Sequence, residues 1–287
     1  MTDPRVIESR VPGLRLGDLF ARSIKCELYA GTLDGREAVV KCLARDAAPW
    51  RWYFERECAL LGAFRETNER AQTPELLAMD AAMGWMVVAK IDGAPLAQGR
   101  FAHDATEADV RAALAARRRW SETTTPLPAL MPDTETRREM RERLLEDPHE
   151  GLAWCAEGLA RGAALALIDP SDAARAIEAL RAWPRRVRSH GDLLPRNVMV
   201  TGEGARLVDL ECAGEHAEGW DHALLRVNVP DALAAVVDAD FGRGDPRRVR
   251  AYRACVAFAL VRERKFVRGS RREGAIAERL REAAAAL

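Results

Sequence analysis

The chain has 287 residues, of which 48% are hydrophobic, and it carries 44 basic and 44 acidic side chains. This length and hydrophobic content suffice for one large domain or two lobes with a sizeable core. The formal net charge of +0 provides no overall attraction to nucleic acid or to an anionic membrane, so neither is an expected partner.

Cysteine usage and the N-terminal segment bear on the cellular compartment. The six cysteines are scattered and form no C-x-x-C pair, which favours reduced core or surface thiols over a disulfide or metal framework. The N-terminus, MTDPRVIESR, lacks the apolar core of a signal peptide. The longest apolar run, near residues 159–168, contains Arg161 and is too short to span a bilayer. We therefore predict a soluble, cytoplasmic protein.

Residues 1–91 are predicted to form a small lobe of antiparallel strands with one helix. Within residues 14–43, LYAGTL and EAVVKCL flank Asp34-Gly35, a strong hairpin signal. Residues 49–64 carry apolar side chains at helical spacing. LLAMD and WMVVAKI predict two further strands, and the following D-G-A-P has the turn chemistry of a linker.

Residues 92–287 are predicted to form a larger, mainly helical lobe, which makes the whole chain α+β. Helical patterns run from about residue 106 to 183 and from about 217 to the end. Between them lie three short predicted strands, RVRSH, NVMV and ARLVDL, the last two joined by a turn at residues 201–204. Residues 104–182 hold 15 acids against 11 bases, and residues 218–287 hold 10 against 14.

The stretch SHGDLLPRNVMV, residues 189–200, places three polar groups just before a predicted strand. Asp192 and Asn197 lie on the loop before this strand, and Asp209 lies at the end of the next one. A loop and a neighbouring strand end can bring these side chains into one small volume. Their oxygens are hard ligands that suit Mg²⁺. Phosphoryl transfer needs such a set, with one carboxylate for the attacking hydroxyl and an Asn and an Asp for the metal.

The pattern H-G-D-x-x-x-x-N, followed twelve residues later by an Asp, resembles the aminoglycoside phosphotransferase and choline kinase family. Members of that family are small-molecule kinases with a bilobal protein-kinase-like fold, and Gly191 stands where protein kinases have Arg. The resemblance extends over about residues 15–225. It implies that Asp192 is the catalytic base and that Asn197 and Asp209 bind Mg²⁺.

Two further residues of this region take supporting roles by the same resemblance. His190 is expected to support the catalytic loop rather than to take part in the chemistry. Asp221, in the W-D that opens the next predicted helix, resembles the family's Asp that braces the loop. D-L-E at residues 209–211 shares only its Asp with the protein-kinase D-F-G, so the Phe-dependent switching of protein kinases is not transferred.

The small lobe supplies a separate group of expected nucleotide contacts. Lys41 ends a predicted strand and is one of only four lysines beside 40 arginines, which indicates that a compact ammonium is required there. The resemblance implies that Lys41 orients the nucleotide phosphates and is held by a Glu on the next helix. We favour Glu57, because E-C-A-L-L matches the family pattern. Glu55, about 200° around the helix, is the alternative.

The nucleotide base and phosphates have further expected contacts. Val88, Ala89 and Ile91, with the intervening Lys, resemble the hinge whose backbone binds the adenine edge. The stretch ARSIKCELY, residues 21–29, occupies the place of the phosphate-covering loop but contains no glycine, although glycine allows backbone N–H groups to approach phosphates closely. Ser23 or Lys25 is expected to replace those contacts.

These features predict an ATP- and Mg²⁺-dependent phosphotransferase that acts on a hydroxyl of a small molecule, such as an antibiotic, a sugar or a related metabolite. One alternative is a catalytically inactive kinase-like nucleotide-binding protein. Another is a protein or lipopolysaccharide kinase, although only eleven residues separate Asp209 from Asp221, too few for an activation segment. The mixed charge of the two helical blocks favours a substrate less cationic than an aminoglycoside.

The remaining polar features are expected to be structural. The Arg-rich stretch at residues 262–272 is expected to be a solvated helix face or a wall of the substrate site, because no series of aromatic residues accompanies it. The other four histidines show no metal-ligand spacing and are expected at the surface or at helix caps: His103, His149, His216 and His222.

Overall fold

The computed structural model describes residues 4–67, 73–147 and 152–287. The chain divides into two compact units. The first comprises Met1–Gly93, Thr123–Arg141 and Arg206–Glu211, and the second comprises Ala94–Glu122, Glu142–Ala205 and Cys212–Leu287. Two segments of the first unit thus come from beyond the predicted boundary at residue 91. The nucleotide and catalytic roles of the predicted lobes 1–91 and 92–287 stay predictions.

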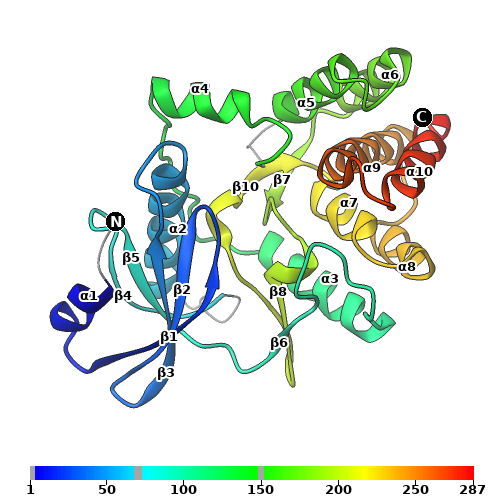
Figure 1. The fold of residues 1–287 in the computed structure, drawn as a ribbon. Coiled ribbons are helices and arrows are strands. Elements are labelled where there is room, and N and C mark those ends of the chain that lie inside the picture. Colours follow the sequence, from blue (N-terminus) through cyan, green and yellow to red (C-terminus); the bar gives the residue numbers. More distant parts are fainter. Residues whose placement is uncertain (1–3, 68–72, 148–151) are drawn as a thin grey trace. The chain divides into compact units, whose positions relative to one another are not determined.

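An antiparallel five-stranded sheet organises the first unit, in the order β1-β2-β3-β5-β4 (Figure 1). The hairpin predicted at Asp34-Gly35 is confirmed, because these two residues join Leu33 to its partner Arg36. Both have positive φ, 50° and 79°, as a two-residue hairpin turn requires. The strands are β1 (Leu14–Arg22), β2 (Cys26–Leu33), β3 (Arg36–Leu43), β4 (Leu76–Asp80) and β5 (Trp85–Ala89).

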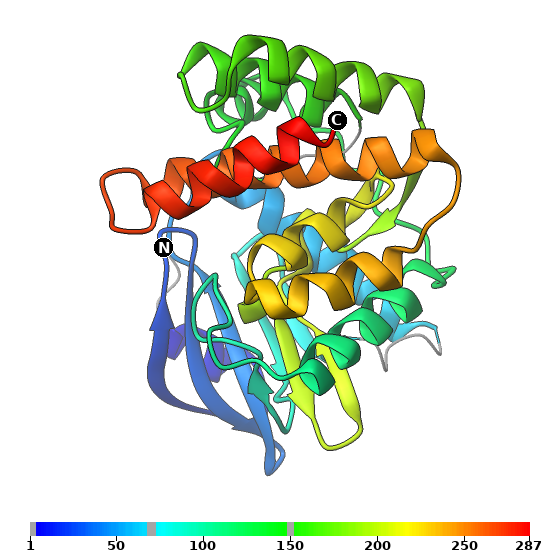
Figure 2. The same ribbon diagram turned by 90° about the vertical axis from the view of Figure 1, so that its right-hand side faces the viewer.

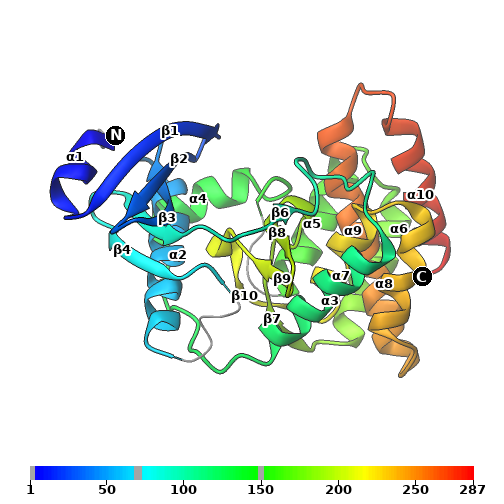
Figure 3. The same ribbon diagram turned by 90° about the horizontal axis from the view of Figure 1, so that it is seen from below.

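Alternation along β3 separates a packed face from a functional face. Val40 is fully buried in a cluster with Ile7 and Val11, which belong to or directly follow helix α1 (Pro4–Arg10). Sequence analysis did not identify α1. Because successive side chains of a strand point to opposite faces, Lys41 points away from this cluster. It reaches helix α2 (Trp50–Arg65), which follows β3 in the chain (Figure 3).

The second unit is built around α9 (Pro246–Val267), whose residues 254–263 are all buried. A helix that is covered on every side belongs at the centre of a core, and α9 packs against α6, α7 and α10 (Figure 2). The other helices of this unit are α3 (Glu107–Ser121), α5 (Leu152–Ala164), α6 (Pro170–Ala182), α7 (Trp220–Val227), α8 (Asp231–Phe241) and α10 (Glu273–Ala285). Helix α4 (Thr134–Glu142) lies almost entirely in the first unit.

Short strands frame the stretch at residues 190–197. Strand β7 (Arg186–Ser189) pairs with β10 (Gly214–Ala217), and β8 (Val198–Thr201) pairs with β6 (Ala94–Pro95). The β8 sheet also includes β9 (Gly204–Leu207). The strand predicted over ARLVDL therefore ends at Leu207. The chain then turns through Asp209 into a 3-10 helix, η3 (Leu210–Cys212), because Asp209 has a left-handed φ of 62° that no strand residue adopts.

Some of the structural expectations need correction. His216 and His222 are buried, with 0% and 3% exposure, so their prediction as surface or cap residues is wrong. Seven of the eight residues of helix α7 are buried, and His222 is accommodated by a contact of 3.1 Å between its Nε2 and Asp240 Oδ2. Arg262, expected on a solvated helix face or a substrate-site wall, is likewise fully buried. His149 lies outside the described residues.

Two other findings bear on the predicted compartment. All six cysteines lie among the described residues, where each is buried and none forms a disulfide. Among the described helices, none combines the length and hydrophobicity needed to cross a bilayer.

Candidate active site

In the first unit, one ammonium group contacts two carboxylates. Lys41 Nζ lies 2.6 Å from Glu57 Oε2 and 2.8 Å from Asp209 Oδ1. Glu55, the alternative partner, instead lies 3.4 Å from Arg51 Nη1. Burial alone would lower the pKa of Lys41, but the Asp209 and Glu57 carboxylates outweigh it and hold the pKa well above its usual value. Lys41 is therefore a permanent cation.

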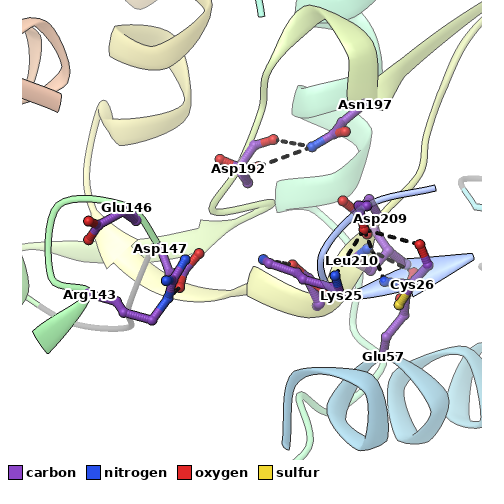
Figure 4. Close-up of polar contacts among 12 residues, drawn as sticks. Lys25, Cys26, Glu57, Arg143, Glu146, Asp147, Asp192, Asn197, Asp209 and Leu210 are labelled. Carbon is purple, nitrogen blue, oxygen red and sulfur yellow. Dashed lines mark hydrogen bonds and ion pairs between the residues drawn. The ribbon is translucent and has the colours of Figure 1, made fainter. Parts of the chain in front are cut away.

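Glu57 also fixes the segment that carries Asp209. Its other oxygen, Oε1, accepts a hydrogen bond of 3.2 Å from the backbone N–H of Leu210 (Figure 4). One buried carboxylate thus links strand β3, helix α2 and the turn after β9. Removing it would leave both the ammonium and the N–H without this acceptor.

Glu211 is a component of this region to which sequence analysis gave no role. Its carboxylate is 7% exposed and lies 2.5 Å from Lys25 Nζ, which also lies 5.0 Å from the Trp50 ring and 5.1 Å from the Tyr53 ring. Burial raises the pKa of Glu211 to about 7, opposed by Lys25 and reinforced by Asp209. The signal that could have identified this residue was the acidic third position of D-L-E.

These carboxylates provide a chemically suitable donor set for a divalent cation. Oxygens of Glu57, Asp209 and Glu211 lie within 4.8 Å of one another. Carboxylate oxygens are the ligands that Mg²⁺ prefers, and Mg²⁺ needs only one or two of them when phosphates and water complete its shell. The donor set around Asp209 therefore fits a magnesium nucleotide.

Ser23 lies in the turn between β1 and β2, and its hydroxyl is engaged locally. It accepts hydrogen bonds from the backbone N–H groups of Lys25 and Cys26, at 3.1 and 3.0 Å, and donates to the Cys26 carbonyl at 3.2 Å. The hydroxyl therefore stabilises a turn that lacks glycine. Any phosphate contact from Ser23 would have to compete with these bonds.

At the predicted hinge, some backbone donors are already used by the sheet. The N–H of Ala89 donates to Glu75 O at 2.8 Å, and the N–H of Lys90 donates to Glu37 O at 3.1 Å. Val88 pairs with Leu76 and Val39 on either side of β5. A cavity of about 240 Å³ adjoins the hinge, and its lining includes Ala89, Lys90 and Ile91 together with Arg36, Glu75 and Arg206. An adenine edge at the hinge would therefore need donors other than the N–H groups of Ala89 and Lys90.

In the second unit, Asp221 holds the start of the loop at residues 190–197. Its two carboxylate oxygens accept the backbone N–H groups of His190 and Gly191, at 2.8 and 3.0 Å. Trp220 Nε1 donates to Gly191 O at 2.7 Å. Gly191 has φ 84°, and a Cβ there would lie 2.1 Å from Cys212 O, so only glycine fits this position. The glycine of H-G-D is thus a steric requirement here.

Asp192 and Asn197 lie together at the end of this loop. Asn197 Nδ2 donates to the Asp192 carbonyl at 2.8 Å and approaches Asp192 Oδ2 at 3.3 Å (Figure 4). His190 Nδ1 accepts the Asp192 N–H at 3.3 Å, so His190 supports the backbone of the loop. Because Asn197 uses its amide nitrogen here, its amide oxygen is the atom suited to a cation.

The profile of the phosphotransferase enzyme family, APH, matches residues 28–254. This match includes Lys41, the loop at residues 190–197 and Asp221. The chain belongs to this phosphotransferase family. No curated protein sequence matches the chain significantly.

Solved structures agree with this fold assignment. Aminoglycoside 2′-phosphotransferase-IIIa, solved with GDP, has 17% identity and a TM-score of 0.58 over 98% of this chain and 97% of its own. Ethanolamine kinase of Plasmodium vivax has 12% identity and a TM-score of 0.58 over 97% and 84%. Aminoglycoside phosphotransferase APH(4)-Ia, solved with ADP and hygromycin B, has 13% identity and a TM-score of 0.59 over 98% and 97%.

Membership of the phosphotransferase family confirms the predicted resemblance and the predicted class of enzyme. The structural likeness confirms the predicted α+β, protein-kinase-like fold. At identities of 12–17%, the likeness does not extend to substrates.

Proposed function

We propose that the protein is an ATP- and Mg²⁺-dependent kinase that transfers the γ-phosphoryl group to a hydroxyl of a small molecule. The observation that carries the proposal is the position of Lys41, whose ammonium group contacts both Glu57 and Asp209. A buried cation between two carboxylates of separate elements is the device that kinases of this fold use to position nucleotide phosphates.

In this proposal the first unit binds the nucleotide. Lys41, held by Glu57, orients the phosphates, and the hinge at Val88, Ala89 and Ile91 receives the adenine. Asn197 and Asp209 would hold the metal, which when bound neutralises charge on the phosphates. The complexes of relatives with GDP and with ADP support the use of a nucleotide.

Asp192 is assigned the role of general base for the acceptor hydroxyl. The proton of that hydroxyl moves to the Asp192 carboxylate, the acceptor oxygen forms a bond to the γ-phosphorus, and the bond from the γ-phosphorus to the leaving nucleoside diphosphate breaks. Asp221 positions Asp192 through the backbone bonds to His190 and Gly191. Holding the carboxylate in place before reaction lowers the entropic part of the barrier.

The proposed acceptor is a hydroxylated molecule that is less cationic than an aminoglycoside. Recognition of a polycation requires several unpaired carboxylates. On α4, Arg138 lies 3.1 Å from Glu139 and 3.9 Å from Glu135, so charge in this acidic block is partly paired on the helix itself. A sugar, a nucleoside or a non-aminoglycoside antibiotic agrees better with this distribution.

The test is a thermal-shift titration of the full chain with ATP, with and without Mg²⁺, followed by measurement of ADP release. We expect ATP to raise the melting temperature more in the presence of Mg²⁺, and Asp209→Ala to abolish this Mg²⁺ dependence. Glu75→Gln, at the rim of the hinge cavity, is the matched control and should retain it. If ATP stabilises the protein but no ADP is formed, either with an acceptor or with water alone, an inactive nucleotide-binding protein is favoured instead.

A further inference from the structure

Three arginines of the second unit lie on elements that pack near residues 190–197 and have no role in the proposal so far. Two of them, Arg262 and Arg272, belong to the Arg-rich stretch that sequence analysis placed on a solvated helix face or at a wall of the substrate site. Arg100 precedes α3, Arg262 lies on α9, and Arg272 lies between α9 and α10. We call these three residues the arginine cluster. Glu263 and the Phe266 ring contact Arg100, the Phe101 ring contacts Arg272, and Arg262 is the residue before Glu263.

Arg100 anchors the cluster. Its Nε donates to Glu263 Oε2 at 3.1 Å and its Nη2 donates to Glu263 Oε1. The guanidinium carbon lies 4.2 Å from the centre of the Phe266 ring. Glu263 has 0% side-chain exposure, whereas Arg100 retains 19%. The carboxylate is therefore fully used by Arg100, while the guanidinium keeps an accessible part.

Arg272 extends the cluster toward the surface. Its guanidinium carbon lies 3.2 Å from the centre of the Phe101 ring, and Phe101 is the residue next to Arg100. A guanidinium in contact with a ring face is held by a cation–π interaction, and its N–H donors lie in one plane. Such a donor array matches the two oxygens of a carboxylate or the oxygens of a phosphate.

Arg262 connects the cluster to the catalytic loop. Its guanidinium carbon lies 5.5 Å from the ring of Trp220, whose indole N–H donates to Gly191 O, beside Asp192. Arg262 Nε and Nη2 donate to the carbonyls of Leu145 and Glu146, at 3.1 and 2.8 Å. Within the described part of the chain, its buried Nη1 has no hydrogen-bond partner.

The negative charge of Asp192 acts on two arginines of the cluster, Arg100 and Arg262. Burial lowers the pKa of Arg262, and the Asp192 carboxylate is the largest influence that opposes it. Burial also acts to lower the pKa of Arg100, but Glu263 and, to a smaller extent, Asp192 outweigh it and leave the pKa raised. Both arginines therefore interact electrostatically with the Asp192 carboxylate.

An ammonium group would be repelled in these surroundings. The cluster contributes three positive charges, and the carboxylate that it contains, Glu263, is already paired with Arg100. Asp192 itself is needed at the hydroxyl. An oxyanion, in contrast, would gain charge-assisted hydrogen bonds from Arg100, which keeps an accessible part, and from the half-buried Arg272.

We infer that the acceptor carries an oxyanion, a carboxylate or a phosphate, close to the hydroxyl that is phosphorylated, and that Arg100 and Arg272 bind this group. This inference rests on the proposed function, because it specifies the substrate class of the same site. The transfer step is unchanged: the hydroxyl proton goes to Asp192 and the nucleoside diphosphate leaves, while the oxyanion keeps its charge.

The test compares acceptors that share a skeleton and differ in charge. ADP release from Mg²⁺-ATP is measured with glucose, glucosamine, glucuronate and glucose 6-phosphate, and then with glycerol, glycerate and glycerol 3-phosphate. We expect kcat/KM for an anionic member to exceed that of the neutral member at least tenfold. Comparison of the carboxylate with the phosphate of each series distinguishes the two kinds of oxyanion.

Two variants test the assigned residues. Arg272→Gln should reduce the ratio of anionic to neutral kcat/KM about tenfold or more, whereas Arg271→Gln, at the neighbouring exposed position, should change the ratio less than twofold. Because Arg100→Gln alone would strand the buried Glu263 carboxylate, Arg100→Gln is combined with Glu263→Gln. This double variant should reduce the ratio to a similar extent.

The outcomes distinguish this inference from the proposed function. If ADP is released neither with any acceptor nor with water alone, the proposed function fails. If ADP release is observed but a neutral or amino acceptor is preferred, or if no anionic acceptor raises release above the rate with water, only the oxyanion inference is overturned. Equal effects of Arg272→Gln and Arg271→Gln would also overturn it.

Discussion

Glu57 Oε2 lies 2.6 Å from Lys41 Nζ, with both side chains at least 88% shielded from solvent. Breaking one member of such a buried pair leaves an uncompensated charge, which is far more damaging than losing a surface ion pair. The contact also selects between two glutamates of α2, since Glu55 is turned toward Arg51. Several consequences of the site geometry can be measured.

Glu57→Gln should lower kcat/KM at least tenfold, equivalent to about 1.4 kcal/mol of transition-state stabilisation. The amide has no charge to hold Lys41, and its single oxygen cannot accept from both Lys41 Nζ and Leu210 N–H as the two carboxylate oxygens do. Glu55→Gln is the matched control, since Glu55 is 40% exposed, and should stay within twofold of wild type. Steady-state kinetics with both variants decide the matter, and a larger loss in Glu55→Gln would refute the assignment of Glu57.

Asp192→Asn should reduce kcat by at least a hundredfold and leave the dissociation constant for ATP within about threefold, because the carboxylate serves the acceptor hydroxyl and not the nucleotide. Asp104→Asn, at an exposed position of the same unit, provides the control. Single-turnover kinetics and ATP titration separate the two quantities. A variant that keeps more than about a tenth of the wild-type rate would rule out Asp192 as the base, since proton transfer contributes ~10²–10⁴-fold.

Gly191→Ala should destabilise the fold by at least about 2 kcal/mol. The left-handed φ of 84° is unfavourable for alanine by ~1–3 kcal/mol, and the added Cβ would lie 2.1 Å from Cys212 O. Gly202→Ala is the control, because a Cβ at Gly202 has nothing within 4 Å. Urea unfolding of both variants measures the difference, and comparable stability of the two would show that the loop at residue 191 adapts without strain.

His222 should make the protein less stable in acid. Burial lowers the pKa of His222 below its usual 6.5, although Asp240 opposes the shift. Between the lowered folded pKa and 6.5 the unfolded chain binds the proton that the folded chain does not. Unfolding free energy therefore falls as the pH drops through this window, by at most ~1.4 kcal/mol per pH unit for one proton.

The measurement for His222 is the unfolding free energy at pH 8 and at pH 5 in wild type and in His222→Gln, which cannot take up a proton. We expect the loss between the two pH values to be smaller in the variant. His103→Gln, at an exposed histidine, should retain the wild-type pH dependence. An unchanged loss in His222→Gln would mean that other groups account for the acid sensitivity.

Much of the fold and of the candidate chemistry was determined by local sequence. The turn residues Asp34 and Gly35 specify a two-residue hairpin through their own backbone preferences. The spacing of His190, Asp192 and Asn197 confines three functional groups to one loop, whatever surrounds it. Such features follow from the sequence because they depend on neighbours along the chain.

Other features were decided by tertiary structure, because they depend on residues far apart in sequence. Helical geometry alone placed Glu55 and Glu57 on different faces, but only the packing of α2 beside β3 determined which of them meets Lys41. The pairing of Lys25 with Glu211 spans 186 positions and leaves no periodic signal. His222 is a polar residue of a type often found at the surface, but it is buried here because seven of the eight residues of α7 are buried. The arginine cluster also depends on tertiary contacts. Arg100 is far in sequence from the Arg-rich stretch at residues 262–272, and it meets that part of the chain through the buried Glu263 carboxylate and the Phe266 ring.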